Sequence, residues 1–422
     1  MSKPIYLFLV FLWFWPLSAQ AFDAFNDSRV PANFVVRGAD GLRLGLKGIA
    51  ELSWRDIEGR GGVGHDSLTD TVTLGTRSGH ANVDGLRLAF RVETPEDLAF
   101  YSAFAFDEYG SRAEGAWFDH RVRLGPGMGL HTEIGLHTPF VAVDDKTSRP
   151  PIAARIYWGS PEMHICSVLS GGGVLNWWAG VSMAMMRPLD AAPINDASER
   201  QGTVAVLSYG PATTFSGNQP VFGGRAGLQM GGFSLEGFGY GGKLSALRGT
   251  DELRNRLAHF ALLPGYNSAD PRSQDRTFWW AGARMELNLG GVEARLEWLE
   301  SQESLLRRHT AYAQLGYVWA LRPNERWLRT LELRVRVERY QIRSASDPLT
   351  PEASLRVVDP SQALTWDYQL ATVALSTRLY RDLLHAHLET SFIKERNGAP
   401  LLGIADQPID NNETTIQLEL RF

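Results

Sequence analysis

Apolar and polar residues alternate one by one along many stretches of this chain. From Leu42 to Arg55, leucines share one side with Gly48, Ala50 and Trp54, while mainly charged and polar residues occupy the other side. A helix would mix these two sets, whereas a β-strand separates them with a period of two. The same alternation recurs at 86–93, 118–124, 284–289, 331–338 and 413–422. The pattern therefore predicts an all-β chain whose strands have one apolar and one charged face.

The length of these stretches separates two kinds of β protein. Strands of a soluble sandwich also alternate, but these stretches run to about 10 residues or more, the length that a tilted strand needs to cross a membrane. After the first 21 residues the sequence has no apolar run of about 18 residues, which a membrane-spanning helix would need. A membrane protein without such runs must be a closed barrel, because open sheet edges are not tolerated in lipid. We therefore expect a transmembrane antiparallel up-and-down β-barrel over residues 41–422.

Short connections alternate with long ones. The short ones fall at 94–97, 125–128, 231–232, 290–291, 323–325 and 381–382, and the long ones at 56–82, 139–151, 242–276, 344–364 and 396–411. Transmembrane barrels have short periplasmic turns and longer outer loops. Both chain ends then lie on the periplasmic side, which requires an even number of strands.

Two strand counts fit the sequence, and they differ in residues 152–222. If Ser160-Pro161 is a turn and Thr203–Tyr209 a strand, the barrel has 18 strands. If Pro188–Phe222 is one large outer loop, it has 16, and Pro161 must lie within or beside a strand, where proline is unfavourable. We prefer 16 strands.

The first 21 residues form a separate segment. Lys3 precedes an apolar run from Ile5 to Leu17, and Ala19-Gln20-Ala21 follows it. This is the order of charge, apolar core and A-x-A site found in secretory signal peptides. We expect a signal peptide at 1–21, cleaved before Phe22, and an N-terminal extension at 22–40. Export combined with a barrel predicts the bacterial outer membrane, where lipid and lipopolysaccharide surround the protein.

Tryptophan, cysteine and net charge narrow the picture further. Aromatic girdles mark the two membrane interfaces of barrels, and we expect Trp54, Trp117, Trp158, Trp279, Trp298, Trp319, Trp327 and Trp366 to lie there. The formal net charge of −5 argues against a nucleic-acid partner. The single cysteine, Cys166, excludes an internal disulfide framework and a multi-cysteine metal site, so we interpret it as a packing residue.

The charged faces of the early strands are mainly basic. The expected channel-lining residues are Arg43, Lys47, Arg55, Arg87, Arg91, Arg121 and Arg123. Rings of Arg and Lys in a pore favour anions. The later strands place carboxylates on the same face, at Glu286, Glu293, Glu297, Glu332, Glu338, Glu389 and Glu419. Two interpretations stay open. The basic and acidic strands could produce a transverse electric field across the lumen, or the charges could form ion pairs along the wall.

Three motifs resemble chemical sites. Gly237–Lys243 satisfies G-x-G-x-x-G, but it ends an alternating strand and no helix start follows, so we interpret it as a glycine-rich strand end. Two sets share a strand face in a pattern that can bind zinc, and they are His385, His387 and Glu389, and His131, Glu133 and His137. A polar lumen lining explains both sets, and no G-x-S-x-G nucleophile elbow is present. We expect no enzyme, no cofactor and no metal.

The last strand resembles the C-terminal signal of Gram-negative porins, since apolar residues alternate from Ile416 to the terminal Phe422. The outer-membrane assembly machinery reads this signal in that class, so the resemblance implies this role for Phe422. Asp40-Gly41-Leu42, Gly48 and the Arg-rich strands are loosely similar to the phosphate-selective porin O/P family. The resemblance implies a channel for passive diffusion of small hydrophilic solutes or ions, and it is compatible with a homotrimer.

The resemblance also implies a constriction loop, because the third outer loop of general porins folds into the lumen. Here that loop is Pro139–Pro151, the third outer connection after Asp56–Asn82 and Glu108–Glu114. It carries Asp144, Asp145, Lys146 and Arg149, which are expected opposite the basic wall. Three alternatives remain open. They are a substrate-specific uptake channel, a plugged barrel in export of an envelope polymer, and a barrel hydrolase whose Ser-His-Asp set is recognised by geometry alone.

Overall fold

The computed structural model describes most of the chain after residue 33. The described ranges are 34–37, 41–60, 63–66, 71–74, 78–107, 110–142, 150–185, 189–193, 205–209, 220–244, 277–303, 306–321, 328–344, 365–380, 383–397 and 408–421. The predicted signal peptide, Phe422 and the segment 143–149 lie outside these ranges. Within them, no helix is long and apolar enough to cross a membrane.

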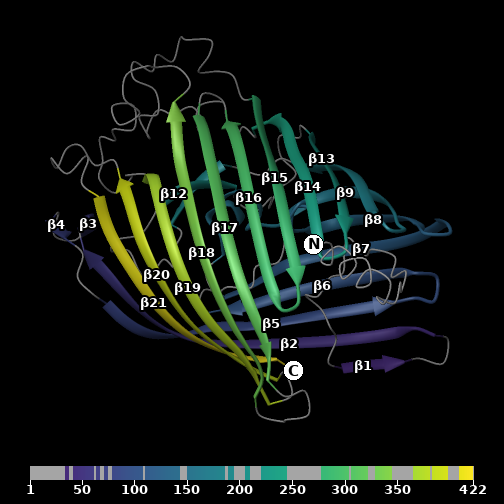
Figure 1. Cartoon of the computed structure of the whole chain (residues 1–422), viewed down its shortest axis with the longest axis horizontal. Coiled ribbons are helices and arrows are strands. Elements are labelled where there is room, and N and C mark those ends of the chain that lie inside the picture. The colour runs from purple at the N-terminus through teal and green to yellow at the C-terminus, as the bar shows by residue number, and fades with distance from the viewer. Residues whose placement is uncertain are drawn as a thin grey trace, which may run out of the picture.

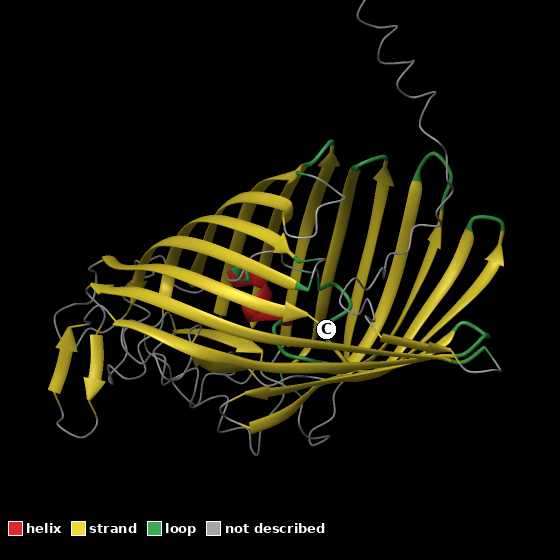
Figure 2. Ribbon diagram, turned by 90° about the horizontal axis from the view of Figure 1, so that it is seen from below, coloured by secondary structure: helices red, strands yellow, loops and turns green. Residues whose placement is uncertain are grey.

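Sixteen antiparallel strands of the described chain close into a barrel (Figures 1 and 2). Each strand pairs with the next one, and β21 pairs with β2 from Ile49↔Arg421 to Arg60↔Asp410. The fold class and the preferred count of 16 are therefore confirmed. The barrel strands are β2 (Arg43–Arg60), β5 (Ser78–Glu93), β6 (Leu98–Asp107), β7 (Gly110–Gly125), β8 (Met128–His137), β9 (Glu162–Gly171), β10 (Asn176–Met185), β13 (Pro220–Met230), β14 (Phe233–Lys243), β15 (Thr277–Leu289), β16 (Val292–Glu303), β17 (Leu306–Ala320), β18 (Leu328–Ser344), β19 (Thr365–Leu379), β20 (Leu384–Asn397) and β21 (Pro408–Arg421).

Besides the barrel strands, the described part of the chain has five short strands and one helical turn. In the predicted N-terminal extension, β1 (Phe34–Arg37) pairs with the start of β2. Two hairpins lie in predicted long loops, β3 (Val63–Asp66) with β4 (Thr71–Leu74), and β11 (Leu189–Pro193) with β12 (Ala205–Tyr209). The helical turn η1 (Ala154–Trp158) lies inside the barrel (Figure 2).

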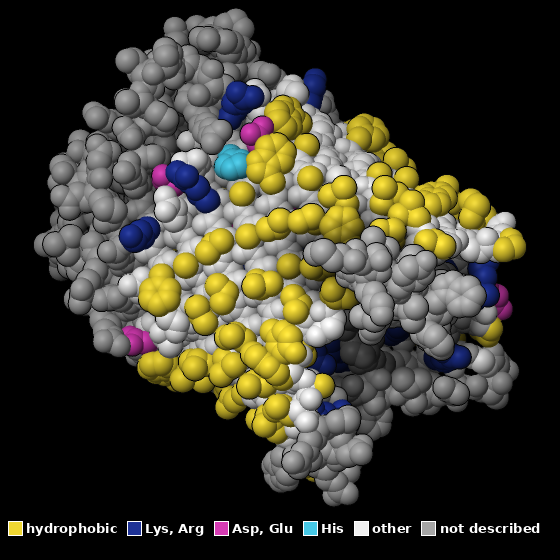
Figure 3. Space-filling model, in the orientation of Figure 1, with side chains coloured by type: hydrophobic (Ala, Val, Ile, Leu, Met, Phe, Trp, Pro, Cys, Tyr) yellow, Lys and Arg dark blue, Asp and Glu magenta, His cyan; other side chains and the backbone are white. Residues whose placement is uncertain are grey.

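The alternation read from the sequence separates the two surfaces of the barrel. Outward side chains such as Trp298, Leu315 and Val335 are exposed, while the inward Glu297 and Arg336 are buried. Figure 3 shows apolar side chains spread over the outer surface of the strands seen in Figure 1. An apolar outer band with polar residues inside is the arrangement that lipid requires of a barrel.

The short connections at 94–97, 125–128, 231–232 and 290–291 form tight turns as predicted, and those at 323–325 and 381–382 lie outside the described residues. Gly290 and Gly291 connect β15 to β16 with φ of +59° and +89°. A type I′ turn needs positive φ at both central residues, and only glycine adopts both without steric cost. Glycine at these positions therefore sets the register of the two strands.

Residues 152–222, where the strand count was uncertain, add no strand beyond the 16 of the barrel at Pro161 or in the β11–β12 hairpin. Residues 150–161 form no strand, and Pro161 directly precedes the first residue of β9. A proline there removes no ladder hydrogen bond. Part of the candidate strand at 203–209 is present as β12, but it pairs only with β11, outside the barrel wall.

Two tryptophans contradict the girdle prediction. Trp54, Trp279, Trp298 and Trp319 are exposed on the outer surface, whereas Trp117 and Trp158 are buried. Trp117 faces the lumen and stacks on Tyr101 and His137, and Trp158 belongs to η1 inside the barrel. Proximity to a strand end did not distinguish an interfacial ring from a lumenal one. Trp327 lies outside the described residues, and the side chain of Trp366 is not described.

Candidate functional site

We call the connection between β8 and β9, residues 138–161, the inserted loop, because the parts of it that the structure describes lie inside the barrel (Figure 2). Its described parts are 138–142 and 150–161. Phe140, Val141, Ile152, Ile156 and Tyr157 are at most 3% exposed, so both parts are packed against other residues. Asp144, Asp145, Lys146 and Arg149, predicted to form the constriction, lie in the segment outside the described residues.

Buried charged side chains of the barrel hold the backbone of this loop. Arg225 Nη1 donates to the carbonyl oxygen of Phe140 at 2.7 Å. Both terminal nitrogens of Arg284 donate to the carbonyl oxygen of Val141 at 3.2 Å. On the other side of the loop, the amide of Ile152 donates to Glu338 Oε2 at 2.8 Å. Hydrogen bonds with an ionised partner are stronger than neutral ones, so these contacts fix both ends of the loop.

Aromatic side chains complete the contact. The Tyr157 ring packs 5.5 Å from Trp280, and its hydroxyl shares a 2.7 Å hydrogen bond with Ser301. Trp158 packs edge-on against Phe238, with 6.1 Å between ring centroids. Burial raises the pKa of Tyr157 above its ordinary value. These partners lie on the inner faces of β13 to β18, which we call the docking wall.

Carboxylates of the docking wall are paired along the wall itself. Arg284 lies 2.7 Å from Glu297 and 3.1 Å from Glu236. Arg334 lies 2.5 Å from Glu332 and 3.3 Å from Glu293. Arg308 pairs with Glu303, which also accepts a 3.0 Å hydrogen bond from the hydroxyl of Tyr209 in β12. This arrangement favours the ion-pair interpretation of the later strands over a transverse field.

The inner faces of β2 and β5 to β9 form a second surface, which we call the N-terminal wall. Arg87 contacts Glu51 at 3.6 Å and Glu114 at 3.4 Å, and Arg91 pairs with Glu93 beneath the Tyr101 ring. The other predicted lining residues are placed as follows: Lys47 is buried, Arg43 and Arg123 are exposed, Arg121 contacts Asp119 at 3.3 Å, and the side chain of Arg55 is not described. The described ends of the inserted loop dock on β13 to β18, while the charged segment expected to face this basic wall lies outside the described residues.

At three ion pairs of the inner surface, the guanidinium group is more accessible than the carboxylate that it contacts. The side chain of Arg121 is 37% exposed and that of Asp119 only 6%. The side chain of Arg378 is 48% exposed and that of its partner Glu332 is 8% exposed. For Arg421 and Glu419 the exposed fractions are 33% and 9%. The accessible charge at these three pairs is therefore positive.

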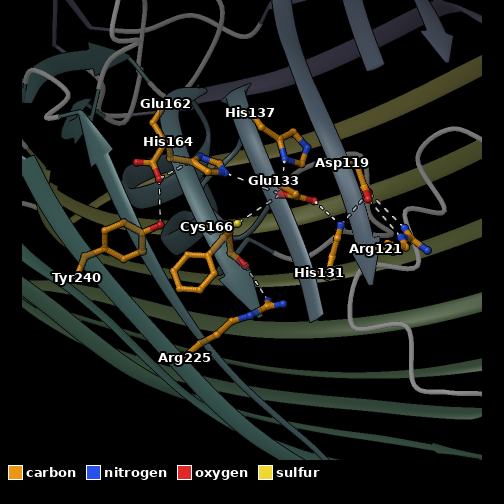
Figure 4. Close-up of polar contacts among 11 residues, drawn as sticks. Asp119, Arg121, His131, Glu133, His137, Glu162, His164, Cys166, Arg225 and Tyr240 are labelled. Atoms are coloured by element: carbon orange, nitrogen blue, oxygen red, sulfur yellow. Dashed lines mark hydrogen bonds and ion pairs between the residues drawn. The ribbon is translucent and has the colours of Figure 1, made fainter. Parts of the chain in front are cut away.

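Histidines, carboxylates and the cysteine gather on β7, β8 and β9 (Figure 4). Glu133 lies at the centre, with Asp119 and Cys166 as its cross-strand neighbours. His131 Nε2 lies 2.8 Å from Asp119, and His137 and His164 face Glu133. Sequence reasoning found His131, Glu133 and His137 but missed His164 and Cys166, whose period-two spacing was the available signal.

A second cluster lies across β20 and β21. Ligand atoms of His385, His387 and Glu419 lie within 4.8 Å of one another. The sequence had grouped the two histidines with Glu389 instead, because all three share one strand face. Both clusters contain residue types that bind transition metals.

No protein-family model and no curated protein sequence matches this chain. Solved structures match it over nearly their whole length. The outer membrane channel DcaP of Acinetobacter baumannii has a TM-score of 0.54 at 11% identity, over 92% of this chain and 99% of that one. OmpF of Salmonella typhi gives 0.52 at 9% identity, over 92% and 100%. The anion-selective porin of Comamonas acidovorans gives 0.50 at 10%, over 90% and 100%. At these identities the likeness concerns the fold.

Proposed function

We propose that this chain is a channel of the bacterial outer membrane for passive diffusion of small hydrophilic solutes. The observation that carries the proposal is the insertion of residues 138–142 and 150–161 into a closed 16-strand barrel with an apolar outer surface. Barrels of 16 to 18 strands leave an aqueous lumen. The similar structures named above include an outer membrane channel and an anion-selective porin, which supports the same function.

The inserted loop is proposed to form the constriction. Its described ends are both anchored in the lumen, at Val141 and Ile152, so the charged segment between them starts and ends there. Asp144, Asp145, Lys146 and Arg149 would then line the narrowest part of the pathway. Paired charges at a narrow aqueous gap orient passing solutes and set ion preference.

Anionic solutes are the proposed preferred class. The support is the greater exposure of Arg121, Arg378 and Arg421 than of their carboxylate partners. A substrate-specific channel for anions, as the loose similarity to the phosphate-selective porin O/P family suggests, is the second candidate. A specific channel saturates with its solute, whereas a general channel conducts in proportion to concentration.

Conductance of the purified protein in a planar bilayer tests the channel proposal. We expect stepwise openings, and a larger step after deletion of Ala142–Ser148. A deletion of equal length in another outer loop, Asp347–Ala353, is the matched control. Absence of any conductance by a folded barrel would favour the plugged export barrel, and an unchanged step after the first deletion would place the constriction elsewhere.

Reversal potentials in a salt gradient test the selectivity proposal. Arg121→Gln should shift selectivity toward cations, and Asp144→Asn combined with Asp145→Asn should shift it toward anions. The two changes act on opposite charges, so shifts of opposite sign are required. Equal reversal potentials in wild type and both variants would mean that these residues do not line the conduction pathway.

Export and assembly are proposed from the two chain ends. The mature protein should begin at Phe22, which N-terminal sequencing of outer-membrane material measures.

Phe422→Asp should lower the yield of assembled barrel, because recognition by the assembly machinery is proposed to need the terminal aromatic residue. Normal assembly of that variant would contradict this role, and crosslinking in membranes would show whether the barrel forms a homotrimer.

A further inference from the structure

The register of three strands assembles a group of side chains that a single strand cannot hold. Glu133 of β8 lies opposite Asp119 of β7 on one side and Cys166 of β9 on the other. His164 lies two residues before Cys166 and therefore on the same inner face. Figure 4 shows the rings of His137 and His164 and the Cys166 sulfur directed toward the Glu133 carboxylate.

The distances around Glu133 Oε2 suit a small bound ion. His137 Nδ1 lies 3.5 Å away, His164 Nε2 3.9 Å away, and Cys166 Sγ, which donates a weak hydrogen bond, 3.7 Å away. The nitrogen distances exceed an ordinary N–H···O bond of about 2.7–3.2 Å. Metal bonds of about 2.0–2.3 Å in a tetrahedral site place the ligand atoms roughly 3.3–3.7 Å apart. The Cys166 distance lies at the upper end of this range, and the 3.9 Å distance of His164 is slightly longer.

His164 gives an independent indication. Its side chain is only 1% exposed, and neither ring nitrogen makes an ordinary hydrogen bond: Nε2 lies 3.9 Å from Glu133 and Nδ1 lies 3.6 Å from Glu162. Buried polar atoms in folded proteins are almost always satisfied. An imidazole buried in this way and directed at a carboxylate and a thiol is placed as a ligand would be.

We propose that Glu133, His164 and Cys166 bind a divalent transition-metal ion of the zinc class. The ligand atoms of these three residues lie within 4.8 Å of one another, and all three residues are buried. Thiolate and imidazole select zinc and its neighbours over magnesium and calcium. Binding releases the thiol proton of Cys166 to solvent, because the thiolate is the ligand.

The residues around this set support it. His137 lies 3.5 Å from the same carboxylate oxygen and has a side chain 13% exposed, so it lies beside this set on its more accessible side. His131 lies 2.8 Å from Asp119 and 3.8 Å from the other oxygen of Glu133, where it restrains the carboxylate. Outer-shell partners of this kind orient metal ligands.

The cluster at β20 and β21 is a weaker candidate and serves as the control. His387 Nδ1 already hydrogen-bonds Ser376 Oγ at 2.8 Å, and both oxygens of Glu419 are engaged by Arg421. The guanidinium group also repels a cation. His387→Ala therefore removes a similar side chain from the same lumen without touching the proposed site.

Metal titration of the purified barrel in detergent micelles tests the proposal independently of conduction. We expect one Zn²⁺ per chain by calorimetry, and a thiolate-to-metal charge-transfer band with Co²⁺. His164→Ala should weaken Zn²⁺ binding by at least roughly tenfold, since loss of even an outer-shell partner costs about 10–100-fold. Cys166→Ser should abolish the charge-transfer band, and His387→Ala should change neither reading.

Folding of each variant is checked by heat-modifiable gel mobility, and His164→Gln replaces the alanine variant if that one does not assemble. Absence of saturable Zn²⁺ binding by the folded wild type would overturn the proposal. Equal binding by wild type, the His164 variant and Cys166→Ser would also overturn it. Loss of binding with His387→Ala alone would move the site to the other cluster, and the assignment to Glu133, His164 and Cys166 would be wrong.

Discussion

The docking wall and the N-terminal wall carry similar residues in the same alternation, yet they use them differently. On the docking wall, Arg284 is 4% exposed and contacts two carboxylates and a loop carbonyl. On the N-terminal wall, the side chain of Arg87 is 49% exposed and has longer contacts to Glu51 and Glu114. One arginine is an internal structural element, and the other is accessible from the lumen.

The inserted loop accounts for this difference. It covers β13 to β18 with apolar side chains such as Tyr157 and Trp158, which exclude water from the ion pairs beneath. Buried charges must be paired, because an unpaired ion in a low-dielectric environment is very costly. The N-terminal wall has no such cover over Arg87 or Arg121 in the described structure, so its charges stay available to solutes. The position of a loop therefore decides which arginines hold the fold and which can act in permeation.

Arginine substitution on each wall gives the largest expected difference. Arg284→Met leaves Glu236, Glu297 and the Val141 carbonyl without their shared donor, and we expect a loss of about 3–5 kcal/mol in the free energy of unfolding. Arg87→Met removes an exposed pair and should cost about 0–1 kcal/mol. Urea titration of the barrel folded into lipid vesicles measures both values. Equal losses would mean that the loop does not shield the docking wall.

Substitutions on the outer face should cost the same stability on both walls, because both outer faces contact lipid. Leu315 of β17 is 58% exposed and Ile134 of β8 is 49% exposed, and both lie on the outer surface. Arginine on the lipid face near the membrane centre costs about 2–4 kcal/mol, so Leu315→Arg and Ile134→Arg should destabilise the folded barrel alike. Asn288→Arg, on the inner face of β15 and opposite Glu293, is the control and should be milder. If either outer variant is harmless in the same urea titration, that strand does not face lipid.

The fold was predictable because its main signal is local. Period-two alternation, as in Leu331 to Glu338, needs only neighbouring residues to be read, and glycine pairs such as Gly290-Gly291 mark the turns. Trp117 and Trp158 were misplaced because a tryptophan near a strand end suits either an interface or the lumen. The covering of the docking wall depends on contacts between residues over a hundred positions apart, such as Ile152 and Glu338.

The His and Cys cluster was only half predictable, for a related reason. His131, Glu133 and His137 lie on one strand, so their common face followed from the alternation. His164 and Cys166 join them through the register of β8 with β9, in which Glu133 lies opposite Cys166. A shift of one residue would have turned both side chains outward. Cysteine alone in a sequence indicates packing, and only its neighbours in space give it another role.

The smallest expected effect concerns a single hydroxyl in the contact between loop and wall. Tyr157→Phe keeps the ring packing against Trp280 but removes the 2.7 Å hydrogen bond to Ser301. A hydrogen bond of this kind contributes about 0.5–1.5 kcal/mol, so the variant should be less stable by that amount near neutral pH. A variant as stable as wild type would mean that the hydroxyl is hydrated rather than buried against the wall.

Alkaline pH should narrow this gap between wild type and Tyr157→Phe. Burial raises the pKa of Tyr157 in the folded protein, while in the unfolded chain it titrates near pH 10. Above that pH the unfolded state loses a proton that the folded state keeps, so ionisation of Tyr157 favours unfolding as pH rises. The phenylalanine variant lacks this effect, and Tyr209 and the other tyrosines are present in both proteins and cancel in the difference. Urea titrations of the two proteins at about pH 8 and about pH 11 measure the change. A difference in unfolding free energy that stays constant with pH would show that Tyr157 ionises as readily in the folded barrel as in the unfolded chain. Water would then reach the contact between the loop and the docking wall.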